Sequence, residues 1–145
     1  MNDMIFIGTF LNQMGHLSFN RHDANSRLRQ VDEIEECLKQ GDSVFVFPEG
    51  TFTPEDGVRP FQLGAFRGAV ATGAPVIPVS LAGTRRFLRD RTLLPRPTHV
   101  TITVLPPIYP QQAAASGDPN HLREMVRLRD QAREAIARYS GEPLL

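Results

Sequence analysis

Three observations predict a single globular domain with an α/β fold, in which helices flank a mainly parallel central sheet. First, segments with helical periodicity alternate with short strand-like segments, which is the pattern of α/β domains. Second, 145 residues are enough for a single domain, 1–145, with one hydrophobic core. Third, 41% hydrophobic and 22% charged residues match the composition of ordinary globular domains.

Four segments carry apolar residues at helical spacing and are expected to be helices. They cover approximately 4–14, 25–40, 61–72 and 119–139. Asn25 or Ser26 can cap the second helix, and Gly41 suits its C-terminal stop. Pro119, after Asp118, suits the first turn of the last helix. On that last helix, four arginines are expected to lie mostly outside: Arg123, Arg127, Arg133 and Arg138.

Four shorter segments are expected to be strands: 16–21, 43–47, 76–81 and 100–104. The apolar run from Val44 to Phe47, within SVFVFPEGTF, predicts a strand buried on both faces. Pro78 interrupts the third strand, and because proline has no N–H for the ladder, we expect it where the strand leaves the sheet. In parallel sheets the working site lies beyond the carboxyl ends of the strands. Those ends carry Arg21, Glu49 and the region of Pro78.

The charge and cysteine content limits the function classes. The formal net charge is zero, so no overall field draws the chain to nucleic acid, and nucleic acid is not expected as a partner. Fifteen of the sixteen Lys and Arg residues are Arg, which reflects either genome composition or recognition of phosphate or carboxylate. Cys37 is the only cysteine, which excludes an internal disulfide and a cysteine-based metal site and fits a reducing compartment. No bound metal or cofactor is expected.

The predicted strand over 43–47 is followed at once by a turn with polar groups. Glu49 supplies a carboxylate, Gly50 lets the backbone approach a ligand, and Thr51 adds a hydroxyl. Arg21, at the end of another predicted strand, can offer a forked pair of donors to a phosphate. These four residues predict a cradle for a small phosphorylated alcohol, and an ordinary surface acid is the alternative for Glu49. Three further residues are expected to support the cradle: Phe47, Pro48 and Pro78.

Four motifs occur in the order found in a known family. FPEGT at 47–51 resembles the third sequence block of the glycerolipid acyltransferases, of the 1-acyl-sn-glycerol-3-phosphate (lysophosphatidic acid) acyltransferase type. GHLSFNR at 15–21 resembles their second block, and VIPVSL at 76–81 resembles their fourth. PFQLGAF at 60–66 is similar to the stretch that follows the third block. The resemblance covers about residues 5 to 110.

The resemblance implies an enzyme of phospholipid biosynthesis. Such an acyltransferase moves a fatty acyl group from acyl-CoA or an acyl-carrier protein to a lysophospholipid or glycerol-phosphate hydroxyl. The second and third blocks are assigned to the acceptor, which on this chain would be bound by Arg21, Glu49, Gly50 and Thr51. Two positions depart from the family pattern. Phe52 stands where the family often has Arg, and Gln62 stands where it often has Lys, which leaves the head group of the acceptor open.

The first block of the family, His-x-x-x-x-Asp, has no counterpart in this chain. That block supplies the general base and the carboxylate that orients it. None of the four histidines is followed by Asp at the fifth position. His22 and Asp23 are adjacent, so on an extended chain they would point to opposite sides. We therefore expect an N-terminally incomplete domain, inactive alone, whose base lies upstream. The alternative is a non-catalytic lipid- or phosphate-binding domain on the same scaffold.

A membrane surface is also expected as a partner. The segment GTRRFLRDRTLLPRP at 83–97 interleaves arginines with apolar side chains, which suits anionic headgroups, with a solvated Arg-rich loop as the alternative. No apolar run approaches the roughly 20 residues of a membrane span. The N-terminus lacks the basic start and cleavage site of a signal peptide. The expected location is therefore cytoplasmic, with peripheral attachment to the inner face of the membrane.

Overall fold

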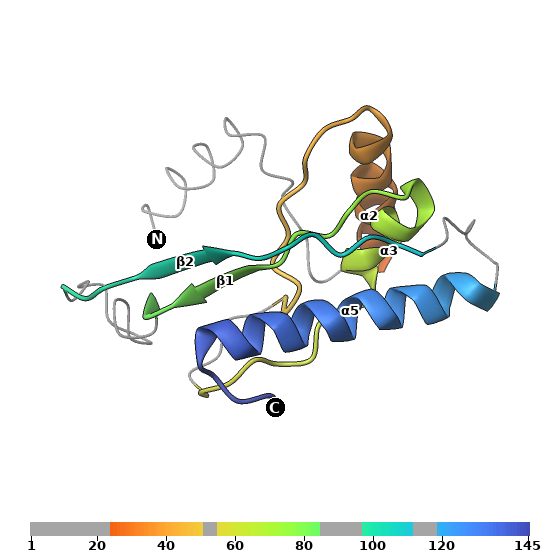
Figure 1. Ribbon diagram of the computed structural model, residues 1–145. Helices are drawn as coiled ribbons and strands as arrows, with labels where there is room; N and C mark the ends of the chain where they lie inside the picture. The colour runs from red at the N-terminus through yellow and green to blue at the C-terminus, as the bar shows by residue number, and fades with distance from the viewer. Residues whose placement is uncertain (1–23, 51–54, 85–96, 112–118) are drawn as a thin grey trace.

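The computed structural model describes residues 24–50, 55–84, 97–111 and 119–145 of the chain. In these ranges lie the elements α2 (Ala24–Lys39), α3 (Gly64–Thr72), β1 (Val79–Ala82), β2 (Thr101–Val104) and α5 (Pro119–Ser140). Figure 1 shows α5 running below the paired strands, while α2 and α3 lie together at one end. This combination confirms the α/β class. The helix predicted over 4–14 and the strand predicted over 16–21 lie outside the described residues.

The two described strands pair in antiparallel fashion, with Val79 opposite Val104 and Ala82 opposite Thr101. The mainly parallel sheet predicted from the sequence is therefore not found in this part of the chain. That prediction rested on helices alternating with strands, but no helix was predicted between 76–81 and 100–104. Strands that follow one another in this way commonly pair antiparallel.

Pro78 lies at an irregularity within this ladder and not where the strand leaves the sheet, as the sequence predicted, because the same two segments pair on both sides of it. It precedes the first residue of β1, and beyond it Val76 forms an isolated antiparallel bridge with Ile108. From Val76 to Val79 the first strand advances three residues, whereas from Val104 to Ile108 the second advances four. The extra residue is a β-bulge, a feature that accommodates proline within a sheet.

One face of the strand pair packs on α5. Ser80 is buried and donates its hydroxyl to the carbonyl of Ile136 in α5 at 3.4 Å. The core beside it consists of Val58, Phe61, Phe66, Ala69, Val70, Leu128, Ala132 and Ala137. Ile102 and Val104, on the opposite face, are 65% and 68% exposed. The described part of the sheet is therefore covered on one side only.

The arginines of α5 are not all at the solvent face. Arg123 and Arg138 are exposed, as predicted, whereas Arg127 and Arg133 are half-buried. Arg127 donates from Nη2 to the carbonyl of Tyr109 at 2.8 Å. The amphipathic pattern of a helix cannot reveal such bonds, because a backbone acceptor on another segment has no sequence signature.

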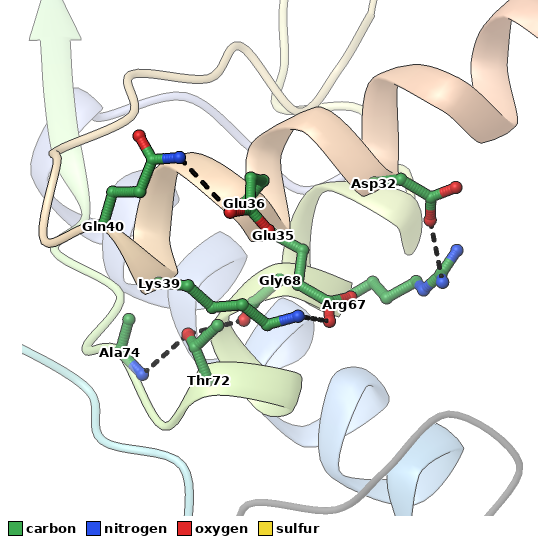
Figure 2. A network of polar contacts seen from close by, with 9 residues as sticks. All are labelled: Asp32, Glu35, Glu36, Lys39, Gln40, Arg67, Gly68, Thr72 and Ala74. Atoms are coloured by element: carbon green, nitrogen blue, oxygen red, sulfur yellow. Dashed lines mark hydrogen bonds and ion pairs between the residues drawn. The ribbon is translucent and has the colours of Figure 1, made fainter.

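Helices α2 and α3 approach each other closely at Gly68. A Cβ atom at this position would lie 3.0 Å from Cδ1 of Leu38 and 3.2 Å from Cγ2 of Ile34. Nearby, Arg67 of α3 reaches Asp32 of α2 with an Nη2–Oδ1 distance of 3.1 Å, as Figure 2 shows. Apolar contact therefore fixes the helix pair, with an ion pair at its rim.

The end of α2 follows the sequence prediction. Gly41 adopts a left-handed φ of 88°, and its N–H donates to the carbonyl of Leu38 at 3.1 Å. The N–H of Asp42 donates to the carbonyl of Cys37 at 3.0 Å. These two bonds form a Schellman motif, in which glycine is favoured because it has no Cβ.

The buried strand predicted after α2 is not found. Residues 42–47 pair with no strand in the described part of the chain. Phe45 and Phe47 are 67% and 65% exposed, and their rings contact each other edge to face at 5.1 Å. The prediction of burial on both faces is wrong here, because an apolar run becomes buried only where neighbouring elements cover it.

Candidate functional site

A tight β-turn from Phe47 to Gly50 carries the candidate carboxylate. The N–H of Gly50 donates to the carbonyl of Phe47 at 3.1 Å and closes the turn. Pro48 occupies the second position, where its fixed φ is favoured, and Glu49 the third. Gly50 has a left-handed φ of 69°, and a Cβ there would meet only Cγ of Gln62 at 3.7 Å. The backbone conformation, rather than lack of space, therefore favours glycine at this position.

The turn is attached to the N-terminal end of α3. The N–H of Gln62 donates to the carbonyl of Pro48 at 2.8 Å, and the carbonyl of Gln62 accepts from the N–H of Ala65 at 3.2 Å. Phe61 is 5% exposed and stacks on Phe66 with ring centroids 6.5 Å apart. The turn therefore lies beside the end of α3 at which the helix dipole is positive.

The structure places four of the predicted residues in one turn: Phe47, Pro48, Glu49 and Gly50. The side chain of Phe47 is largely exposed, and that of Glu49 is half-buried. Arg21 and Thr51 lie outside the described residues. Their meeting with Glu49 around one ligand stays a prediction.

Pro78 belongs to the sheet rather than to this turn. It is buried, and its carbonyl accepts a hydrogen bond from the N–H of Leu105 at 2.9 Å. No hydrogen bond between described residues joins it to 47–50. Its supporting role at the site also stays a prediction.

The histidines of the described ranges lie apart in the fold. His99 is exposed two residues before β2, and His121 is buried in the first turn of α5. His16 and His22 are outside the described residues. No group of three His, Cys, Asp or Glu residues within 24–50, 55–84, 97–111 and 119–145 could hold a metal ion.

Two residues near the turn escaped the sequence interpretation. Gln62 was marked only as lacking the cation of the family, yet its backbone N–H holds the turn. Arg133 of α5 donates to the carbonyls of Arg59 and Val58, just upstream of Gln62. Neither role leaves a signal in the sequence, because every acceptor is a backbone carbonyl.

The family model described as Acyltransferase matches residues 1–82, more than half of the chain and including the 47–50 turn. The chain belongs to the acyltransferase family. Among curated proteins, this acyltransferase-family chain is 39% identical over 82 residues to a chloroplastic 1-acyl-sn-glycerol-3-phosphate acyltransferase of Brassica napus, with 57% of this chain and 24% of that protein covered. It is 32% identical over 134 residues to one of Chlamydomonas reinhardtii, with 90% and 36% covered.

A solved structure is similar as well. The 1-acyl-sn-glycerophosphate (LPA) acyltransferase PlsC of Thermotoga maritima matches with a TM-score of 0.63 and 30% identity. The match covers 78% of this chain and 43% of that chain. The acyltransferase-family chain thus spans between 24% and 43% of the length of these three relatives. None of the helices in its described ranges is long and apolar enough to cross a bilayer.

Proposed function

We propose that this protein transfers a fatty acyl group from acyl-CoA or acyl-carrier protein to the hydroxyl of a lysophospholipid or glycerol phosphate, as a 1-acylglycerol-3-phosphate O-acyltransferase of phospholipid biosynthesis. The observation that carries the proposal is the 47–50 turn, which presents Glu49 beside the N-terminal end of α3. The family match over residues 1–82 includes this turn. Relatives named 1-acyl-sn-glycerol-3-phosphate acyltransferases support the choice of reaction.

The chemistry of the residues suits an acceptor that carries a phosphate. Arg21 can donate two hydrogen bonds to the phosphate, and the positive end of the α3 dipole favours the same anion. Glu49 does not touch the phosphate in this arrangement; it accepts a hydrogen bond from the acceptor or orients Arg21. Gly50 and Thr51 complete the acceptor contacts with backbone and hydroxyl groups.

The transfer itself needs a general base. The acceptor oxygen attacks the carbonyl of the thioester, its proton passes to the base, and the thiol of the donor leaves. These 145 residues contain no His-x-x-x-x-Asp pair, so the proposal assigns the base to a segment outside them. The same absence favours a second candidate function, binding of a lipid or phosphate without catalysis. The acyl thioester enters as a substrate, and no resident cofactor is proposed.

The proposal extends to location and to the sheet. A lipid acceptor and the Arg-rich sequence at 83–97 favour peripheral attachment to the inner, cytoplasmic face of a membrane. We also propose that the extended segment 43–47 joins a mainly parallel sheet once a strand pairs with it. Such pairing would cover Phe45 and Phe47, which are exposed in the described structure.

Calorimetric titration of the purified chain with 1-oleoyl lysophosphatidate, below its micelle concentration, tests the proposal. We expect saturable binding that weakens about tenfold in Glu49→Gln, because a charged hydrogen-bond acceptor is lost. Glu33→Gln, an exposed acid of α2, is the matched control and should bind like wild type. Absence of binding, or equal binding by Glu49→Gln, would contradict the acceptor site.

A second assay tests the assignment of the general base to a segment outside these 145 residues. With oleoyl-CoA added, the chain alone is expected to release no CoA thiol. Release of thiol that disappears in His22→Ala would overturn the assignment of the base to a segment outside the chain.

A further inference from the structure

The guanidinium of Arg133 binds main-chain oxygens of three residues. Its Nε donates to the carbonyl of Arg59 at 3.0 Å, and its Nη2 donates to the carbonyl of Val58 at 2.8 Å and to the main-chain oxygen of Leu145, the last residue of the sequence. The ion pairs of the described residues involve other cations. A charged, planar donor group makes strong and directional hydrogen bonds. Two successive carbonyls, at 58 and 59, are therefore fixed relative to α5.

The C-terminal segment, residues 143–145, also bonds to the backbone of Val58. Val58 forms a parallel bridge with Leu144, in which its N–H donates to the carbonyl of Pro143 at 2.8 Å. Its carbonyl accepts both the N–H of Leu145 at 3.1 Å and the Nη2 of Arg133. The side chain of Val58 is 3% exposed. The position of this residue is thus determined on its backbone and its side chain alike.

A short stiff segment leads from there to the 47–50 turn. After Arg59 come Pro60, whose ring fixes φ, and Phe61, whose side chain is in the core. The next residue, Gln62, bonds through its N–H to the carbonyl of Pro48. A displacement of Arg59 would therefore move the amide that supports the turn.

We infer that Arg133 is a positioning residue for the 47–50 turn. By fixing the carbonyls of residues 58 and 59, it fixes the N–H of Gln62 and, through Pro48, the direction of the Glu49 carboxylate. Arg133 does not contact the acceptor in this arrangement. The inference rests on the proposed function of the turn and adds a residue outside the motifs of the family resemblance.

Three variants test the inference on the full chain. Arg133→Met keeps the aliphatic stem and removes all donors, Arg133→Lys keeps a single donor centre, and Arg138→Met alters an exposed arginine of the same helix. Amide hydrogen exchange at Gln62 and Leu128 is measured by NMR, and affinity for 1-oleoyl lysophosphatidate by calorimetry. Exchange at Leu128 reports global unfolding, whereas exchange at Gln62 reports the local link.

We expect Arg133→Met to exchange the Gln62 amide about tenfold faster, with Leu128 unchanged, and to bind lysophosphatidate about fivefold more weakly. Arg133→Lys should give intermediate values of Gln62 exchange and of lysophosphatidate affinity. If Arg133→Met fails to fold, the test uses Arg133→Lys alone. Arg138→Met should match wild type. Binding and Gln62 exchange that stay at wild-type values in both Arg133 variants would overturn the inference. Failure of the proposed function differs from this result, because then wild type itself does not bind lysophosphatidate.

Discussion

The two sides of the 47–50 turn are held in different ways. Downstream, Val58 and Phe61 are buried, and Arg133 and the C-terminal segment bond to the backbone. Upstream, residues 42–47 pair with no described strand, and two phenylalanines lie largely in solvent. The upstream side, SVFVF at 43–47, is the more apolar of the two in sequence, whereas TPEDGVRP at 53–60 is mostly polar. The difference teaches that hydrophobic composition around a motif does not reveal which side fixes its geometry.

Replacing one phenylalanine on each side gives the largest expected contrast. Phe61→Ala removes a ring from the core and should lower the free energy of unfolding by about 3–5 kcal/mol. Phe47→Ala removes an exposed ring and should change it by less than about 0.5 kcal/mol. Urea denaturation followed by circular dichroism measures both. A large loss for Phe47→Ala would show that the upstream side is covered in solution, which the proposed extension of the sheet requires.

The contact between α2, which lies before the turn in sequence, and α3, which lies after it, gives a smaller effect on the free energy of unfolding. In Gly68→Ala the new Cβ meets Leu38 and Ile34, so overpacking should cost about 1–3 kcal/mol, offset by about 1 kcal/mol of helix propensity. Denaturation should therefore show a modest net loss of unfolding free energy. Adding Leu38→Ala, which vacates the nearest atom, should recover part of it relative to Leu38→Ala alone. If Gly68→Ala stabilises the chain instead, α2 can move away from α3 at little cost.

The attachment of Gln111 to α5 through Glu124 should make the free energy of unfolding depend on pH. Hydrogen bonds from Arg127 and from the N–H of Gln111, the latter at 2.6 Å, lower the pKa of Glu124 below its ordinary value of 4.5. Because the folded pKa is the lower one, this stabilisation is present above pH 4.5 and is lost as the pH falls through the folded pKa. In Glu124→Gln the decline of unfolding free energy below pH 4.5 should be shallower than in wild type. An identical decline in acid titrations of both proteins would contradict the assignment.

The smallest effect is expected at the rim of the helix pair. Asp32 and Arg67 form an exposed ion pair, so Asp32→Asn should lower the free energy of unfolding by less than about 0.5 kcal/mol (Figure 2). The difference should shrink further in high salt, because exposed charges are screened. Denaturation at low and high ionic strength measures it. A loss of unfolding free energy above about 1 kcal/mol would contradict this expectation. It would show that the ion pair, and not the apolar contact alone, fixes the helix pair.

Local features of the fold could be predicted from the sequence. Helices α2 and α5 follow from periodicity, and the Gly41 stop follows from capping, which acts within a few residues. The N-terminal cap predicted at Asn25 or Ser26 is wrong, because α2 begins at Ala24 and includes both residues. Helix α3 begins at Gly64, later than predicted, because Gln62 bonds to the turn instead. Strand direction and the exposure of Phe45 depend on residues distant in sequence, so they could not be predicted.

In the candidate site, too, the local features could be predicted from the sequence and the long-range contacts could not. The turn at Glu49 and Gly50 was predicted because proline and glycine specify it locally. Arg133 was placed at the solvent face, because a helix pattern records which residues are polar and not where distant carbonyls lie. Residues that hold a motif in place are therefore harder to recognise than the motif itself.

The bulge opposite Pro78 determines which side chains reach the interior. Ile102 and Val104 of β2 point outward, and Leu105, the residue after β2, points inward. Strict alternation would turn Ile108 outward, but the additional residue reverses the pattern, and Ile108 packs against the core. Deleting one residue between Leu105 and Ile108 would remove the bulge and restore strict alternation, with the isoleucine still opposite Val76 and facing inward. The bulge therefore absorbs one additional residue in this stretch while the apolar side chains on both sides of it keep facing the interior.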